Sequence, residues 1–146
     1  MKTIATNRRA KFDYEILDRV EAGMILTGGE VKSCRAGHID LRGAYVSFHA
    51  GKPVLKQSTI APYAYASDRE SYLPGRDRPL LLKKSEVEKL KEQAQQQGIT
   101  IVPLEVKAGK FIKIVLGIAR GRKTIDKRRA IREREVSKKL RKGEEI

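Results

Sequence analysis

The chain has 146 residues, a length that suits one compact domain and is short for two. Lysine and arginine outnumber aspartate and glutamate by 32 to 18, and the net charge of +14 favours nucleic acid as a partner, with an anionic membrane surface second. A single cysteine excludes an internal disulfide, and the chain shows neither a secretory signal nor a membrane-spanning run, so we expect a soluble cytoplasmic protein.

The first elements follow from apolar patterning and helix-end signals. Residues 12–26 alternate and then form an apolar run, which predicts two strands joined near residues 21–23. Thr27 is a good N-cap and Gly37 a good terminator, and together they predict a short helix over GGEVKSCRAG.

The faces of this short helix are also predicted. Val31 and Cys34 are three residues apart and share a buried face. The same spacing leaves Glu30, Lys32 and Arg35 available at the surface. Cys34 is therefore interpreted as a small core residue and not as a reactive thiol.

A hairpin and a long loop come next. Residues 44–60 predict two strands with a turn at residues 50–53. Residues 61–79 contain three prolines and predict an irregular loop, and such a long loop in a compact domain is usually functional or mobile.

The last ordered elements are a helix and a second hairpin. Residues 85–98 predict the clearest helix, with Ser85 as its cap and Gly98 as its end. Residues 99–121 predict two strands about a turn at residues 108–110. Short strands with two to three short helices predict a mainly β fold, an OB-like antiparallel β-barrel over residues 1–120.

A basic C-terminal tail follows, over residues 121–146. It holds 11 Lys and Arg against 5 Asp and Glu, and its apolar residues form no continuous stripe. Its residue types favour a helix, yet it has no core of its own. We expect it to be disordered when free and to fold as a helix against RNA.

The chain offers little for catalysis. His38 and His49 lie in predicted loops with no second cysteine to complete a zinc set, and we interpret both as surface residues. LTGGEVKS lacks the spacing of a phosphate-binding loop. We therefore expect no enzymatic activity, no metal and no cofactor.

Basic clusters are better represented than catalytic groups. They lie at residues 7–11, at residues 76–78 and 83–84, and along the last hairpin at residues 107–113. Each cluster alone is compatible with a solvated surface, but together with the net charge they favour phosphate contacts.

Five segments in order resemble one known family. They are NRRAKFDYEI, VEAGMILTGGEVKSCRAGHIDL, AYV, PLLLKKSEVEKL and GRKTIDKRRAIREREV. They are similar to the SsrA-binding proteins, also called small protein B, the partners of bacterial transfer-messenger RNA. The resemblance extends from about residue 7 to residue 140.

This resemblance implies a function in trans-translation. Family members bind the tRNA-like domain of transfer-messenger RNA and deliver it to stalled ribosomes with elongation factor Tu and GTP. The tail then enters the empty mRNA channel of the small subunit, near the decoding centre of 16S rRNA. The alternative is a ribosomal protein or a general RNA chaperone with an OB fold.

The resemblance also assigns site residues. For binding of transfer-messenger RNA these are Asn7, Arg8, Arg9, Glu21, Lys32, Arg35 and Leu81. For the decoding centre they are Gly121, Arg122, Lys123, Ile125, Asp126, Lys127 and Arg128. Core packing is an equally good interpretation of Leu81.

Two positions depart from the family pattern. Ile125 stands where an aromatic residue or histidine is common, so apolar contact is expected there in place of stacking on a base. Gly29 stands where other members often carry a bulkier residue, which would loosen the start of the helix.

Overall fold

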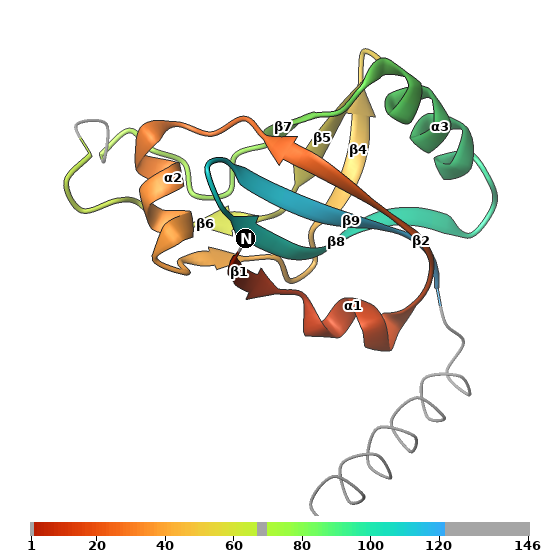
Figure 1. Ribbon diagram of the computed structural model, residues 1–146, viewed down its shortest axis with the longest axis horizontal. Coiled ribbons are helices and arrows are strands. Elements are labelled where there is room, and N and C mark those ends of the chain that lie inside the picture. Colours follow the sequence, from red (N-terminus) through yellow and green to blue (C-terminus); the bar gives the residue numbers. More distant parts are fainter. Residues whose placement is uncertain (1, 67–69, 122–146) are drawn as a thin grey trace, which may run out of the picture.

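The computed structural model describes residues 2–66 and 70–121 (Figure 1). This part of the chain contains nine strands and three helices. In chain order they are β1 (Lys2–Thr6), α1 (Arg8–Asp13), β2 (Tyr14–Met24), α2 (Gly28–Arg35), β3 (Ile39–Asp40), β4 (Tyr45–His49), β5 (Lys52–Lys56), β6 (Thr59–Ile60), β7 (Arg78–Leu81), α3 (Lys84–Ala94), β8 (Ile99–Ala108) and β9 (Ile112–Gly121).

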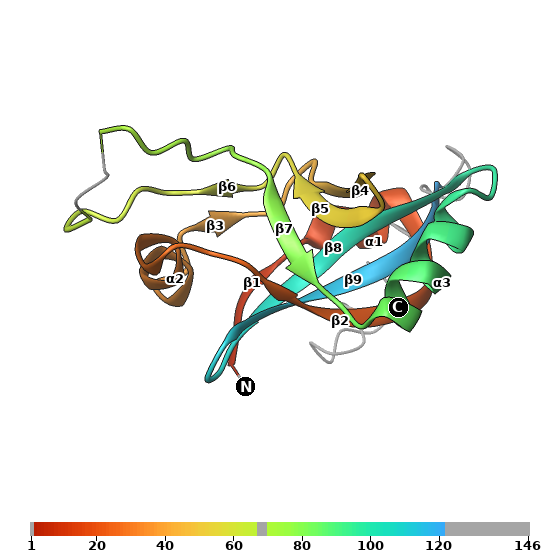
Figure 2. The same cartoon turned by 90° about the horizontal axis from the view of Figure 1, so that it is seen from above.

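Seven strands form one antiparallel sheet, in the order β1-β8-β9-β2-β7-β5-β4. The sheet curls until β4 contacts β8, so it encloses a core in the manner of a barrel (Figure 2). The separate pair β3–β6 and the long loop after β6 project beside α2. The predicted mainly β barrel is confirmed, with three helices.

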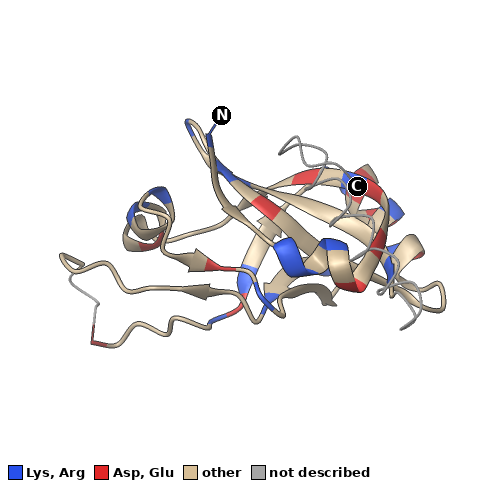
Figure 3. Cartoon of the chain, turned by 90° about the horizontal axis from the view of Figure 1, so that it is seen from below, with Lys and Arg blue, Asp and Glu red and all other residues tan. Residues whose placement is uncertain are grey.

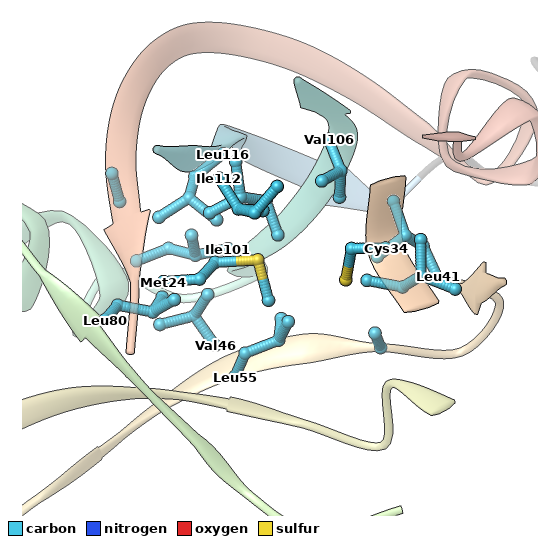
Figure 4. Packing of buried hydrophobic residues seen from close by; sticks show 14 of the residues in the cluster. Met24, Cys34, Leu41, Val46, Leu55, Leu80, Ile101, Val106, Ile112 and Leu116 are labelled. Carbon is cyan, nitrogen blue, oxygen red and sulfur yellow. The ribbon is translucent and has the colours of Figure 1, made fainter. Parts of the chain in front are cut away.

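The core lies inside the curled sheet. Figure 4 shows Met24 of β2 and Leu80 of β7 pointing toward Ile101 of β8, with Cys34 of α2 at the other side of the cluster. Cys34 has no exposed surface, which confirms its predicted place in the core. Burial raises the pKa of its thiol to about 11, so the thiol stays protonated at neutral pH.

A smaller apolar cluster covers the outer face of β8 and β9. Ala10 of α1 packs there against Val102, Leu104 and Val115. Helix α1 therefore buries the second face of these strands (Figure 1). This double burial explains why IVLGIA in β9 is a continuous apolar run and not an alternating one.

The predicted pair of strands within residues 12–26 is wrong. A short helix, α1, ends at Asp13, and β2 then runs unbroken from Tyr14 to Met24. It pairs with β9 from Tyr14 to Gly23, and its last two residues also pair with β7. The apparent break near residues 21–23 is where the strand gains this second neighbour.

Two predicted element boundaries also need correction. The hairpin β4–β5 turns on two residues, Ala50 and Gly51, with φ of 50° and 77°, so Pro53 already belongs to β5. Helix α3 begins before Ser85, because the backbone N–H of Lys83 donates to the Glu86 carboxylate at 3.1 Å and closes the helix start there. The hairpin β8–β9, with its turn after Ala108, is confirmed.

Candidate RNA interface

Glu21, Leu81 and Lys113 lie together on the outer surface where β2 meets β7 and β9. Gly23 of β2 is paired with Leu81 on one side and with Lys113 on the other. The Lys113 ammonium lies 3.4 Å from the Glu21 carboxylate, and both side chains remain about half exposed. Leu81 is 61% exposed, so core packing is the wrong interpretation of this leucine; its neighbour Leu80 is the buried one.

This surface is hollowed. A depression of about 350 Å³ lies over the end of β2 and the start of α3, and Gly23 leaves its floor without a side chain. The residues that line it are Glu21, Ala22, Gly23, Leu81, Leu82, Lys83, Glu86 and Lys113. An exposed apolar side chain beside two carboxylates and two ammonium groups suits a nucleotide, which has an apolar base face, polar edges and a phosphate.

Helix α2 adds two cations on the neighbouring side of the barrel. Thr27 caps the helix, as predicted, and Glu30 closes a capping box with it. Lys32 is exposed. Arg35 is exposed too, and its guanidinium donates to the carbonyls of Gly109 and Lys110 at 2.9 and 3.3 Å, which ties α2 to the β8–β9 turn.

Glu30 is not available at the surface, contrary to the prediction. It is 1% exposed and lies between Arg76 and Arg78, with the Arg78 Nη2 atom 2.9 Å from its carboxylate. Burial alone would raise the pKa of Glu30, but hydrogen bonds from Arg76, the Thr27 amide and Arg78 outweigh it and lower the pKa to about 2.

Arg78 itself is fully buried and cannot be a phosphate contact. Its guanidinium donates to the carbonyls of Ser58 and Pro74 at 2.9 and 2.7 Å and to the Tyr72 hydroxyl at 2.9 Å. This Glu30–Arg78 cluster fastens the long loop after β6 to α2. The basic cluster predicted at residues 76–78 is therefore structural.

The N-terminal motif, residues 7–9, also combines a buried structural residue with exposed cations. Asn7 is 6% exposed; its Oδ1 accepts from the Ala10 amide at 3.3 Å, and its Nδ2 donates to the Pro103 carbonyl at 2.9 Å. Asn7 therefore caps α1 and leaves almost no exposed surface for RNA. Arg8 and Arg9, in contrast, are exposed on α1.

Arg8 and Arg9 border an open cleft of about 740 Å³. Its lining residues are Thr6, Arg8, Arg9, Phe12, Ile39, Asp40 and Arg42. The Arg9 guanidinium lies 4.6 Å from the centre of the Phe12 ring and 3.2 Å from the Asp13 carboxylate, so two contacts hold it flat against the helix.

The structure does not bring these two surfaces together. Helix α1 directly precedes Tyr14, whereas Glu21 lies seven residues further along β2, a distance of about 23 Å along an extended strand. The residues assigned to one RNA therefore occupy two separate regions of the barrel.

The tail begins near α1. Gly121 is the last residue of β9 and pairs with Tyr14, so it belongs to the barrel and not to the tail. The other residues assigned to the decoding centre, 122–128, lie outside the described residues.

Other kinds of site receive no support from the described part of the chain. His38 and His49 are both exposed. Across residues 2–66 and 70–121, no three His, Cys, Asp or Glu side chains are grouped so that they could hold a metal ion. Over the same residues, none of the helices is long and apolar enough to cross a membrane.

Comparisons with known proteins match nearly the whole chain to one family. The family described as SmpB protein matches residues 4–145. An SsrA-binding protein of Synechococcus sp. (strain JA-3-3Ab) is 45% identical over 96% of this chain and 92% of its own length. The SsrA-binding protein of Deinococcus radiodurans is 44% identical over 97% of this chain and 99% of its own.

A solved structure is also similar. It is described as "tmRNA-SmpB: a journey to the center of the bacterial ribosome", is 42% identical, and matches with a TM-score of 0.69 over 85% of this chain and 87% of that chain. A sequence match of this length and a shared barrel leave one conclusion. The chain belongs to the SmpB protein family.

Proposed function

We propose that this protein is a non-catalytic adaptor that binds transfer-messenger RNA through its tRNA-like domain and brings it to stalled ribosomes for trans-translation. The observation that carries the proposal is the family match from residue 4 to residue 145, together with relatives named SsrA-binding protein. The similar solved structure, described as tmRNA-SmpB and the bacterial ribosome, supports the same partners.

The depression at Glu21 is the part of the barrel best suited to an RNA loop. The Glu21 carboxylate accepts hydrogen bonds from a base amino group or a ribose 2′-hydroxyl, whereas Lys113 attracts a phosphate. Leu81 offers an apolar surface to a base or sugar. Lys32 and Arg35, both exposed, extend the positive surface along α2.

Arg8 and Arg9 make a second phosphate-binding region on α1. Both are exposed cations beside an open cleft, and Asn7 acts on them indirectly because it holds the start of their helix. The separation of this region from Glu21 means that an RNA must bend around the barrel, or that the two regions contact different RNAs.

The tail completes the adaptor. We propose that residues 121–128 act at the decoding centre of 16S rRNA and that the tail enters the mRNA channel as a helix. Residues 121–146 hold eleven Lys and Arg and too few apolar residues to form a core of their own, so RNA phosphates are the natural partners of these cations. Elongation factor Tu with GTP is the proposed delivery partner.

A competition experiment separates this function from the alternative of a ribosomal protein or a general RNA chaperone. The full chain is bound to labelled transfer-messenger RNA at moderate salt and challenged with unlabelled bulk tRNA. We expect transfer-messenger RNA to be retained against a large excess of tRNA, since recognition depends on shape as well as charge. Equal competition by the two RNAs would support the general chaperone.

A further inference from the structure

The tip of the β8–β9 hairpin carries an exposed aromatic ring. Phe111 directly precedes β9 and is 64% exposed, and it is not among the residues assigned to RNA above. Its neighbour Ile112 is buried in the core at 4% exposure. The core therefore fixes the chain on one side of the tip and leaves the ring outside.

The tip is held in one conformation. The Gly109 amide donates to the Phe111 carbonyl at 3.2 Å and closes the turn. On the outside, the Arg35 guanidinium bonds the carbonyls of both Gly109 and Lys110. A ring on a braced turn loses little conformational freedom when a ligand stacks on it.

Several lysines lie on the strands beside the ring. Lys107 and Lys113 are paired directly across β8 and β9, and each also forms an ion pair, Lys107 with Glu105 at 3.6 Å and Lys113 with Glu21 at 3.4 Å. Lys110 Nζ lies 5.8 Å from the centre of the Phe111 ring, and Lys2 is paired with Ala108 on the neighbouring strand. Figure 3 shows this basic colour at the hairpin tip beside the N-terminus and on the nearby helix α2.

This combination identifies the occupant. An exposed ring alone would suit a protein partner, but a ring with several lysines and an arginine around it suits a base whose phosphates lie on either side. We infer that Phe111 is a stacking platform for one unpaired base of the bound RNA, with Lys107, Lys110 and Lys113 on the adjoining phosphates. The inference rests on the proposed RNA-binding function and adds a specific contact to it.

The platform is continuous with the depression described above. Lys113 lies two residues from Phe111 and also forms the ion pair with Glu21. One RNA loop can therefore place a nucleotide in the depression and stack the next unpaired base on the ring. Stacking does not depend on hydrogen bonds, so the platform accepts any of the four bases.

The absence of tryptophan from the chain gives a direct test. In Phe111→Trp the only indole stands at the tip, and a stacked base quenches its fluorescence. Leu17→Trp is the matched control, because Leu17 is 45% exposed and lies toward the opposite end of β2. We expect saturable quenching by transfer-messenger RNA in Phe111→Trp and little change in Leu17→Trp.

Affinity and its salt dependence form the second readout. Phe111→Leu keeps an apolar side chain but removes the ring, and we expect at least about fivefold weaker binding with an unchanged salt slope. Phe111→Tyr should bind like the unaltered chain, whereas Lys110→Gln should lower the salt slope by about one.

Three results would overturn the inference. The first is normal affinity in Phe111→Leu, and the second is equal quenching at both tryptophan positions. The third is quenching of Phe111→Trp by ribosomal protein but not by RNA, which would point to a protein partner. These outcomes leave the proposed function intact, because that function fails only if the unaltered chain shows no preference for transfer-messenger RNA.

Discussion

Neutralising Glu30 should destabilise the barrel strongly, because its buried carboxylate holds two arginines. Glu30→Gln keeps the shape of the side chain and removes its charge, so fully buried Arg78 loses its ionic partner. The pKa of Glu30 falls from its ordinary value of 4.5 to about 2. Because one pKa unit corresponds to about 1.36 kcal/mol, ionised Glu30 contributes about 3 kcal/mol to the free energy of unfolding at neutral pH.

An independent argument gives a similar magnitude. Removing one partner of a buried ion pair costs about 3–5 kcal/mol, because the remaining charge is buried without compensation. Urea unfolding of the full chain, followed by circular dichroism, measures the effect. With a slope of about 2 kcal/mol per molar urea, we expect the midpoint of Glu30→Gln to fall by about 1.5 M.

The pH dependence has a defined sign. The pKa of Glu30 is lower in the folded chain than in the unfolded chain, so its contribution is complete above about pH 4.5 and disappears as the pH falls toward 2. The difference between the unaltered chain and Glu30→Gln should therefore shrink over this window. A midpoint like that of the control Glu88→Gln, whose carboxylate is exposed on α3, would refute the reasoning, as would a difference that persists in acid.

Three further predictions concern binding and folding separately. Leu81→Ala should weaken binding to transfer-messenger RNA with little change in thermal stability, whereas Leu80→Ala, in the core, should lower stability by about 2–5 kcal/mol in urea unfolding. Asn7→Ala should cost about 1–3 kcal/mol of stability, because it removes the cap of α1 and the hydrogen bond from Asn7 to the Pro103 carbonyl. Arg8→Gln should leave stability unchanged and lower the salt slope of RNA binding by about one. Removing residues 122–146 should leave circular dichroism of the barrel and RNA affinity largely in place and abolish tagging on stalled ribosomes in a reconstituted translation assay; persistent tagging would contradict the decoding-centre role.

Local patterns in the sequence predicted the elements that depend on local physics. The β8–β9 hairpin follows from alternation about a glycine turn, and α2 follows from Thr27 as N-cap and Gly37 as terminator. Helix α1 was missed because six residues are too few to show a helical period, and strand β1, of five residues, was missed with it. The sequence signal that could have found α1 was Asn7, a strong N-cap residue read only as an RNA contact.

The wrong predictions that Glu30 and Arg78 are exposed have a different cause. Whether an arginine is exposed or buried depends on a partner far along the chain, and Glu30 and Arg78 are 48 residues apart. Neither residue type nor spacing distinguishes Arg78, which is buried, from Arg8, which is exposed. For the same reason the part that Asn7 plays in the fold, as the buried cap of α1, became visible only in three dimensions.

Strand β9 sets the geometry of the whole adaptor. The proposed RNA platform lies just before its first residue, Ile112, and the tail starts after its last residue, Gly121. Ten residues of extended strand span about 33 Å, and pairing on both sides keeps them from bending freely. The strand thus fixes the distance between the two proposed RNA-binding ends. Inserting two residues in both β9 and its partner strands would shift the start of the tail by about 7 Å while preserving which side chains face inward.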